Sequence, residues 1–188
     1  MDLSVYYALN GLAGHGVWPN RFLRGIATYL PLMMGLVLVG AWFWPDSVPL
    51  RVQRQRLVAY AVPAALLGLA IAQIVGHLWF RERPYVHHSA HLIVPRSSDP
   101  AFPSDHAVGG FALASPFVLA RRRLGWILLT MAALLACSRV AVGTHYPSDV
   151  IGGAIVGTGA GYVVWRARWV IDPPLTLSLV YARRLRLA

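Results

Sequence analysis

Long apolar stretches without charge alternate with short polar segments along this chain. Residues 25–45 and residues 57–80 contain no Asp, Glu, Lys or Arg, and each is longer than the roughly 20 helical residues that cross a bilayer. Three shorter stretches follow, and they reach a spanning length only when polar residues at their ends are included. We therefore expect three further spans, near residues 104–122, 124–144 and 148–168.

The last predicted span carries Gly153, Gly157 and Gly161 at four-residue spacing. Small residues at this spacing lie on one face of a helix and allow a neighbouring helix to approach closely. The whole pattern predicts an all-α integral membrane protein, in which five transmembrane helices form one compact bundle and residues 1–188 form a single domain.

The first twenty residues are open to two interpretations. Residues 3–18 are only weakly apolar, and they include Asn10 and His15. We expect residues 1–20 to form a helix that lies along the membrane interface. In the alternative, residues 3–18 form a sixth, short transmembrane helix, which would move the N-terminus to the other side without moving the later polar segments.

The composition favours a membrane protein and argues against a nucleic-acid partner. Of the 188 residues, 57% are hydrophobic and only 13% are charged, which is little charge for the surface of a soluble domain. The formal net charge is +10, and the chain has Arg but no Lys. These arginines lie between apolar stretches rather than along one exposed face, so they indicate membrane orientation and not nucleic-acid binding.

The arginines are distributed unevenly between the two sides of the predicted bundle. One side, formed by residues 46–56, residues 121–123 and everything after residue 165, carries 11 Arg and 2 acidic residues. The other side carries 6 Arg and 5 acidic residues. Because arginine-rich loops tend to stay in the cytoplasm, we expect the first side, including a basic tail over residues 172–188, to be cytoplasmic.

Residues suited to phosphoryl chemistry gather on the less basic side, in three short blocks. The blocks are Arg83-Pro84, Pro103-Ser104-Asp105-His106, and Ser138-Arg139 followed by His145 and Asp149. Histidine can supply a nucleophile and an acid for attack on phosphorus, and arginine can hold phosphate oxygens.

His145 precedes Asp149 by four residues, and Pro147 marks the first turn of a predicted helix. The spacing predicts a hydrogen bond between one ring nitrogen of His145 and the Asp149 carboxylate, which leaves the other nitrogen basic. Such a pair on its own is most often a simple helix-end interaction. Its combination with the other two blocks favours a catalytic role.

The other polar residues of the blocks have complementary roles. Ser104 stands at the predicted start of a span, where its hydroxyl can cap the helix and help to hold a phosphate. His106 is placed to protonate a leaving oxygen. Arg139 lies within an apolar stretch, where an unpaired charge is costly, so we expect it to face an anionic pocket together with Arg83.

Two further interpretations of the polar residues are weaker. His87, His88 and His91 lack an accompanying Cys or a well-placed carboxylate, so we expect no metal site there. An anion transporter could also hold Arg, His and Asp in the membrane, but it usually needs polar groups at the bilayer midplane. No acidic residue or histidine lies in the middle of a predicted span.

The three blocks closely resemble the signature of the type 2 phosphatidic acid phosphatase superfamily. Its members are metal-independent phosphatases whose active site is shared with vanadium haloperoxidases. Longer segments resemble one branch, the bacitracin-resistance-type undecaprenyl pyrophosphate phosphatases of bacterial membranes. These segments are residues 10–15, 79–86, 102–106 and 142–150.

The resemblance implies a role for each residue of the blocks. His145 is implied to be the nucleophile that forms a phosphohistidine, Asp149 to orient it, and His106 to be the general acid. The residues implied or expected to contact the substrate phosphate are Arg83, Ser104, Arg139 and Asp105. No metal and no cofactor is implied.

The resemblance also implies a reaction and a location. The reaction is hydrolysis of undecaprenyl pyrophosphate to undecaprenyl phosphate, which recycles the lipid carrier of cell-wall synthesis, and the site faces the extracytoplasmic side of the bacterial plasma membrane. The implied partners are a polyprenyl diphosphate and the lipid bilayer. Other lipid phosphates are alternative substrates: phosphatidic acid, phosphatidylglycerol phosphate or a lipid A phosphate.

The chain departs from the superfamily pattern at two positions. The usual lysine seven residues before Arg83 is Gly76, so the phosphate has one cation fewer. Arg81 is a candidate to compensate, but it would point elsewhere if this segment is helical. The usual glycine between Ser104 and His106 is Asp105. A carboxylate at this position can favour the protonated imidazolium of His106, or simply complement the positive end of a helix.

Overall fold

The computed structural model describes residues 2–173, 175 and 176, and this part of the chain is helical and contains no β-strand. The helices are α1 (Asp2–Asn10), α2 (Val17–Phe43), α3 (Val48–Leu78), α4 (Pro84–His87), α5 (Asp105–Leu119), α6 (Arg123–Ala141) and α7 (Pro147–Arg166). The all-α class predicted from the sequence is confirmed. Most of the predicted basic tail, residues 172–188, lies outside the described residues.

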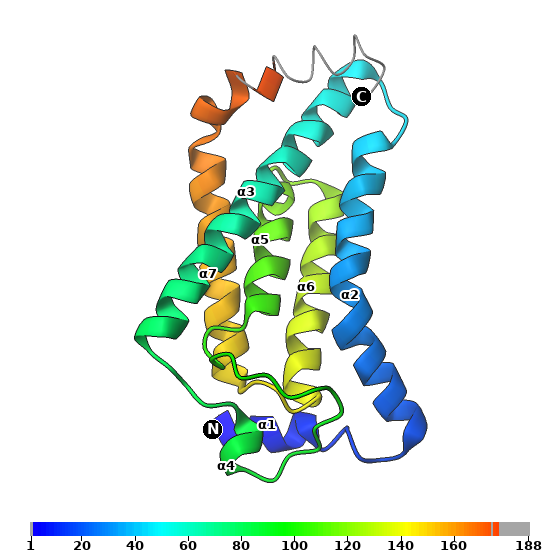
Figure 1. The fold of residues 1–188 in the computed structure, drawn as a ribbon. Coiled ribbons are helices and arrows are strands. Elements are labelled where there is room, and N and C mark those ends of the chain that lie inside the picture. Colours follow the sequence, from blue (N-terminus) through cyan, green and yellow to red (C-terminus); the bar gives the residue numbers. More distant parts are fainter. Residues whose placement is uncertain (1, 174, 177–188) are drawn as a thin grey trace.

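The five long helices run side by side, with α5 inside the bundle (Figure 1). Helix α5 packs against α3, α6 and α7, while α2 packs against α6 and α3. Three helices, α2, α3 and α6, are long and apolar enough to cross a membrane. Helices α5 and α7, of 15 and 20 residues, run alongside them. This arrangement agrees with an integral membrane protein, and the number of five crossings stays a prediction.

Helices α5 and α7 approach each other closely because α7 presents glycines to α5. A Cβ atom added at Gly157 would lie 2.3 Å from the carbonyl oxygen of Val108, and one added at Gly161 would lie 2.3 Å from Cβ of Ser115. At Gly153 the added atom would lie 2.7 Å from the carbonyl oxygen of Ser104. The glycine seam predicted from the sequence is therefore confirmed, and it brings the start of α5 against the start of α7.

Helix α1 lies across the end of the bundle at which α4 and the loops before α5 and α7 gather (Figure 1). Its 9 residues are too few for a crossing, which needs about 20, so α1 does not form a sixth span by itself. Asp2 accepts hydrogen bonds from the backbone N–H of Ser148 at 2.9 Å and from its hydroxyl at 2.6 Å. The Asn10 amide donates to the carbonyls of His91 and Ala141. These bonds attach α1 to the loops that carry the motif blocks.

The arginine-rich segments lie at the opposite end of the bundle (Figure 1). This end contains the α2–α3 connection, the start of α3 and the α5–α6 connection with Arg121, Arg122 and Arg123. The length of the bundle therefore separates these arginines from all three motif blocks, as their positions in the sequence predict.

Gly157→Ala is expected to destabilise the protein, because the new methyl group would overlap the α5 backbone. Overpacking of this kind costs about 1–3 kcal/mol. Gly159→Ala on the same helix is the matched control, because nothing lies within 4 Å of the Cβ atom that it would add. Thermal unfolding in detergent should show a lower midpoint for Gly157→Ala only, and equal midpoints for the two variants would contradict the close α5–α7 contact.

Candidate active site

The three motif blocks meet at one end of the bundle because each lies at a helix terminus. Arg83 directly precedes α4, Ser104 directly precedes α5, and Arg139 lies in the last turn of α6. His145 lies in the loop between α6 and α7. The second and third blocks are joined by a backbone hydrogen bond of 3.1 Å, which the N–H of Ser104 donates to the carbonyl of Asp149.

His145 is buried, with 2% of its surface exposed, and its Nδ1 lies 2.9 Å from the carbonyl oxygen of Ala101. A carbonyl oxygen only accepts, so Nδ1 carries the proton and Nε2 keeps its lone pair in the neutral ring. Burial lowers the pKa of His145, and the positive charges of Arg83 and Arg139 lower it further. The imidazole is therefore neutral near pH 7 and has one basic nitrogen available.

The direct hydrogen bond between His145 and Asp149 that the spacing predicts is not formed. Nδ1 of His145 lies 3.8 Å from the nearest carboxylate oxygen of Asp149, which is the distance of an ion pair and not of a hydrogen bond. The N–H at Nδ1 donates its hydrogen bond to the Ala101 carbonyl instead. The buried carboxylate of Asp149 accepts one hydrogen bond from the backbone N–H of Tyr146 at 2.8 Å, which caps α7.

Arg81 is a structural partner of Asp149 that the sequence does not identify. One guanidinium nitrogen of Arg81 lies 2.7 Å from Oδ1 of Asp149, and another lies 3.0 Å from Asp2. The guanidinium carbon lies 4.1 Å from the ring centroid of Tyr146. Arg81 thus contacts Asp149, Asp2 and Tyr146, and it holds the Asp149 carboxylate in place.

Several polar atoms of the site are buried without a protein partner. The Ser104 hydroxyl is fully buried and forms no hydrogen bond, so the side-chain cap predicted for Ser104 is not formed. Nε of Arg139 is also buried and unpaired. Arg83 uses its Nε to donate to the carbonyl of Asp99 at 3.0 Å. Buried polar groups without partners are costly, and a phosphate would satisfy them.

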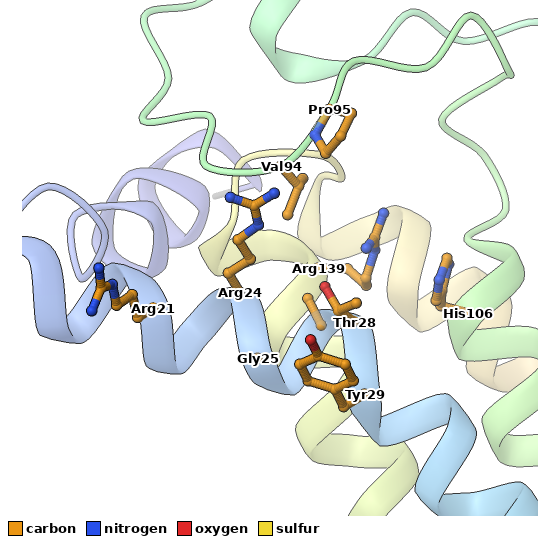
Figure 2. Close-up of a pocket in the computed structure, with 10 residues that line it drawn as sticks. Arg21, Arg24, Gly25, Thr28, Tyr29, Val94, Pro95, His106 and Arg139 are labelled. Carbon is orange, nitrogen blue, oxygen red and sulfur yellow. The ribbon is translucent and has the colours of Figure 1, made fainter.

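The two neighbouring residues Asp105 and His106 diverge in the first turn of α5. The Asp105 carboxylate accepts a hydrogen bond from the side-chain amide of Gln73 on α3, at 3.0 Å. His106 lines a cavity together with Arg139, between α5, α6 and the first turns of α2 (Figure 2). The Asp105 carboxylate is therefore hydrogen-bonded to α3, while its charge also acts on Arg83.

The loop histidines have separate partners. His87 pairs with Glu82, whereas His88 packs edge-on against Tyr7 and Tyr146. Over residues 2–173, 175 and 176, no group of three or more His, Cys, Asp or Glu side chains is arranged to hold a metal ion.

A buried neutral imidazole, two arginines and an unpaired hydroxyl gather at one end of a bundle of apolar helices. This combination defines the class of protein: a membrane-embedded phosphatase.

Comparison with known proteins agrees with this class. The chain matches the model of the PAP2 superfamily over residues 57–172. It is 30% identical over 173 residues to undecaprenyl-diphosphatase BcrC of Bacillus subtilis (strain 168), a match that covers 92% of this chain and 87% of that protein. It is 36% identical over 130 residues to decaprenylphosphoryl-5-phosphoribose phosphatase of Mycobacterium tuberculosis (strain ATCC 25618 / H37Rv), which covers 69% of this chain and 67% of that protein.

Among solved structures, Aquifex aeolicus LpxE has a similar fold, with a TM-score of 0.73 at 20% identity, covering 88% of this chain and 94% of that one. The chain belongs to the PAP2 superfamily. The superfamily resemblance derived from the motif blocks is thereby confirmed.

Arg81→Gln is expected to destabilise the protein by about 1–3 kcal/mol, because it removes a charged partner from the buried Asp149 carboxylate. Adding Asp149→Asn removes the uncompensated charge as well. The double variant should therefore lose less unfolding free energy than the sum of the two single losses. Unfolding of all three variants in detergent measures this coupling, and strictly additive losses would mean that the two side chains act independently.

Proposed function

We propose that this protein hydrolyses undecaprenyl pyrophosphate to undecaprenyl phosphate and inorganic phosphate through a phosphohistidine. The observation that carries the proposal is the neutral His145 ring, whose free Nε2 belongs to a cluster with two arginines and an unpaired serine hydroxyl. The relation to undecaprenyl-diphosphatase BcrC supports a polyprenyl diphosphate as the substrate. The reaction would return the lipid carrier to cell-wall synthesis.

In the first step, Nε2 of His145 attacks the terminal phosphorus, and the bond between this phosphorus and the bridging oxygen breaks. The proton of His106 goes to the bridging oxygen, so the leaving group departs as undecaprenyl phosphate. Arg83, Arg139 and Ser104 hold the three equatorial oxygens, where negative charge is concentrated. Water then attacks the phosphorus of the phosphohistidine, the Nε2–P bond breaks to release inorganic phosphate and free His145, and a proton of the water returns to His106.

Asp149 has an electrostatic role in this scheme. His145 gains positive charge as the new N–P bond forms, and the Asp149 carboxylate lies 3.8 Å from its Nδ1. The carboxylate stabilises this charge across a short, buried distance without taking the Nδ1 proton. The Ala101 carbonyl fixes the orientation of the ring.

We place the site at the extracytoplasmic boundary of the bacterial plasma membrane. The supporting observation is the arginine-rich end of the bundle, which lies opposite the site and favours the cytoplasm. A polyprenyl diphosphate keeps its headgroup at such a boundary while its tail stays in the lipid. We also propose that α1 lies along the same interface.

A lipid phosphomonoester is the second candidate substrate. The observation in its favour is the relation to decaprenylphosphoryl-5-phosphoribose phosphatase, whose name describes a phosphatase of a polyprenyl-linked sugar phosphate. The chemistry at His145 would be the same, with a sugar hydroxyl as the leaving group.

His145→Ala is expected to reduce phosphate release from undecaprenyl pyrophosphate by at least about 10³-fold, because it removes the nucleophile. His15→Ala is the matched control, since His15 is exposed and lies outside the three motif blocks. The assay uses purified protein in detergent with a chelator present. Parallel assays with phosphatidic acid and phosphatidylglycerol phosphate rank the substrates, and substantial activity in His145→Ala would contradict the proposed nucleophile.

The acid limb of the kcat/KM profile is expected to have an apparent pKa below about 6.5, the ordinary value for histidine. Burial lowers the pKa of His145, so the ring becomes neutral and nucleophilic already at lower pH. The Asp149 charge opposes this shift, so Asp149→Asn should move the limb to still lower pH. Comparing both enzymes on one substrate cancels the titration of the substrate itself. A limb that moves to higher pH in Asp149→Asn would refute the electrostatic role.

A further inference from the structure

A second basic region adjoins the site on the side of α2. A cavity of about 640 Å³ lies between the first turns of α2, the loop at Val94 and Pro95, and the residues His106 and Arg139 (Figure 2). Its lining includes Arg21 and Arg24 in addition to Arg139, and it includes no carboxylate. The cavity therefore has a strongly positive wall. Of its lining residues, only His106 and Arg139 have a role in the proposed reaction.

Arg24 and Arg21 differ in their surroundings. Arg24 has no ion pair or hydrogen bond with any residue in the described part of the chain, and its guanidinium rises from α2 toward the same loop as Arg139 (Figure 2). Arg21 lies one helical turn earlier and packs over the ring of Trp18, with 5.6 Å between the guanidinium carbon and the ring centroid. Arg24 is the arginine of α2 that faces the site without a counter-ion.

A smaller, mostly apolar cavity continues from the basic one. It has a volume of about 220 Å³, and His106 lines both cavities. Its walls come from α2, α5 and α6 and include Pro31, Met34, Leu113 and Leu135. A headgroup site and an apolar groove therefore meet at His106.

The position of His106 determines where each part of a diphosphate lies. His106 protonates the bridging oxygen in the proposed reaction, so the terminal phosphate lies on its His145 side. The cavity lined by His106 and Arg139 also contains Arg24 and Thr28, and the apolar cavity that shares His106 can take the start of the prenyl chain. The phosphate that carries the chain would then lie in the part of the cavity lined by Arg24 and Thr28.

We propose that Arg24, assisted by the Thr28 hydroxyl, binds the second, lipid-bearing phosphate of the substrate and thereby selects diphosphates over monophosphates. The proposal rests on the proposed function and adds a specificity subsite to it. Arg24 lies outside residues 57–172, which match the superfamily model. A residue that distinguishes substrates within a superfamily need not belong to the pattern that all its members share. The α3 position at which the superfamily pattern has lysine cannot contribute, because Gly76 packs against Pro100.

The test compares two probes that share one lipid chain, farnesyl diphosphate and farnesyl monophosphate, in the same detergent. Arg24→Ala should lower kcat/KM for the diphosphate by about tenfold or more, the usual scale for losing a charged hydrogen bond to phosphate. It should change kcat/KM for the monophosphate by less than about twofold. Arg24→Lys should recover part of the loss, because the charge is kept while the paired geometry is lost.

Arg123→Ala is the control, because it removes the same charge from an exposed position at the opposite end of the bundle, and it should leave both substrates unaffected. A second measurement uses soluble probes: Arg24→Ala should weaken inhibition by inorganic pyrophosphate about tenfold and leave inhibition by orthophosphate unchanged. Equal losses on both lipids, or no loss on either, would overturn the subsite.

Failure of the proposed function gives a different result. In that case the unaltered protein hydrolyses the monophosphate and not the diphosphate. The pyrophosphate arm then decides the subsite independently: a selective loss of inhibition in Arg24→Ala supports it, and an unchanged inhibition constant refutes it.

Discussion

The close contact of α5 with α7 is the constraint on which the site depends. Glycines at positions 153, 157 and 161 allow the two backbones to approach, and larger residues there would push the helices apart. At the end of this contact, the N–H of Ser104 bonds to the carbonyl of Asp149. Residues that are 45 positions apart in the chain are thereby held by backbone atoms, which move less than side chains do. The relative position of His106 and His145 follows from helix packing.

The second constraint is the cost of gathering positive charge in a partly buried place. Arg83 and Arg139 both act on His145, and the nearby carboxylates of Asp149 and Asp105 are engaged with Arg81 and Gln73. These carboxylates offset part of the positive potential, and a bound anion would offset more of it. Burial and this potential together keep the His145 ring neutral, and the potential attracts anions, so the same surroundings would prepare the proposed nucleophile and its substrate.

The sequence predicts the helices and, through the three motif blocks, the superfamily, because both depend on local patterns. Uncharged stretches longer than a bilayer crossing identify α2 and α3, and the glycine spacing identifies the seam on α7. The partners of the site residues are not local. Arg81 contacts Asp2, which is 79 positions away, and the path of the loop before α5 decides which carbonyl reaches His145. For that reason the spacing of His145 and Asp149 suggests a hydrogen bond between them, whereas His145 donates to the distant Ala101 carbonyl.

The bond from His145 to Ala101 would also fix the regiochemistry of the proposed phosphohistidine. With Nδ1 occupied, the phosphoryl group would attach to the ring nitrogen remote from the Cβ atom, giving one phosphohistidine isomer and not a mixture. The acceptor is a main-chain oxygen, so replacing the methyl side chain at 101 leaves it intact. The backbone conformation therefore determines the isomer, and a comparison of side chains between sequences would not reveal it.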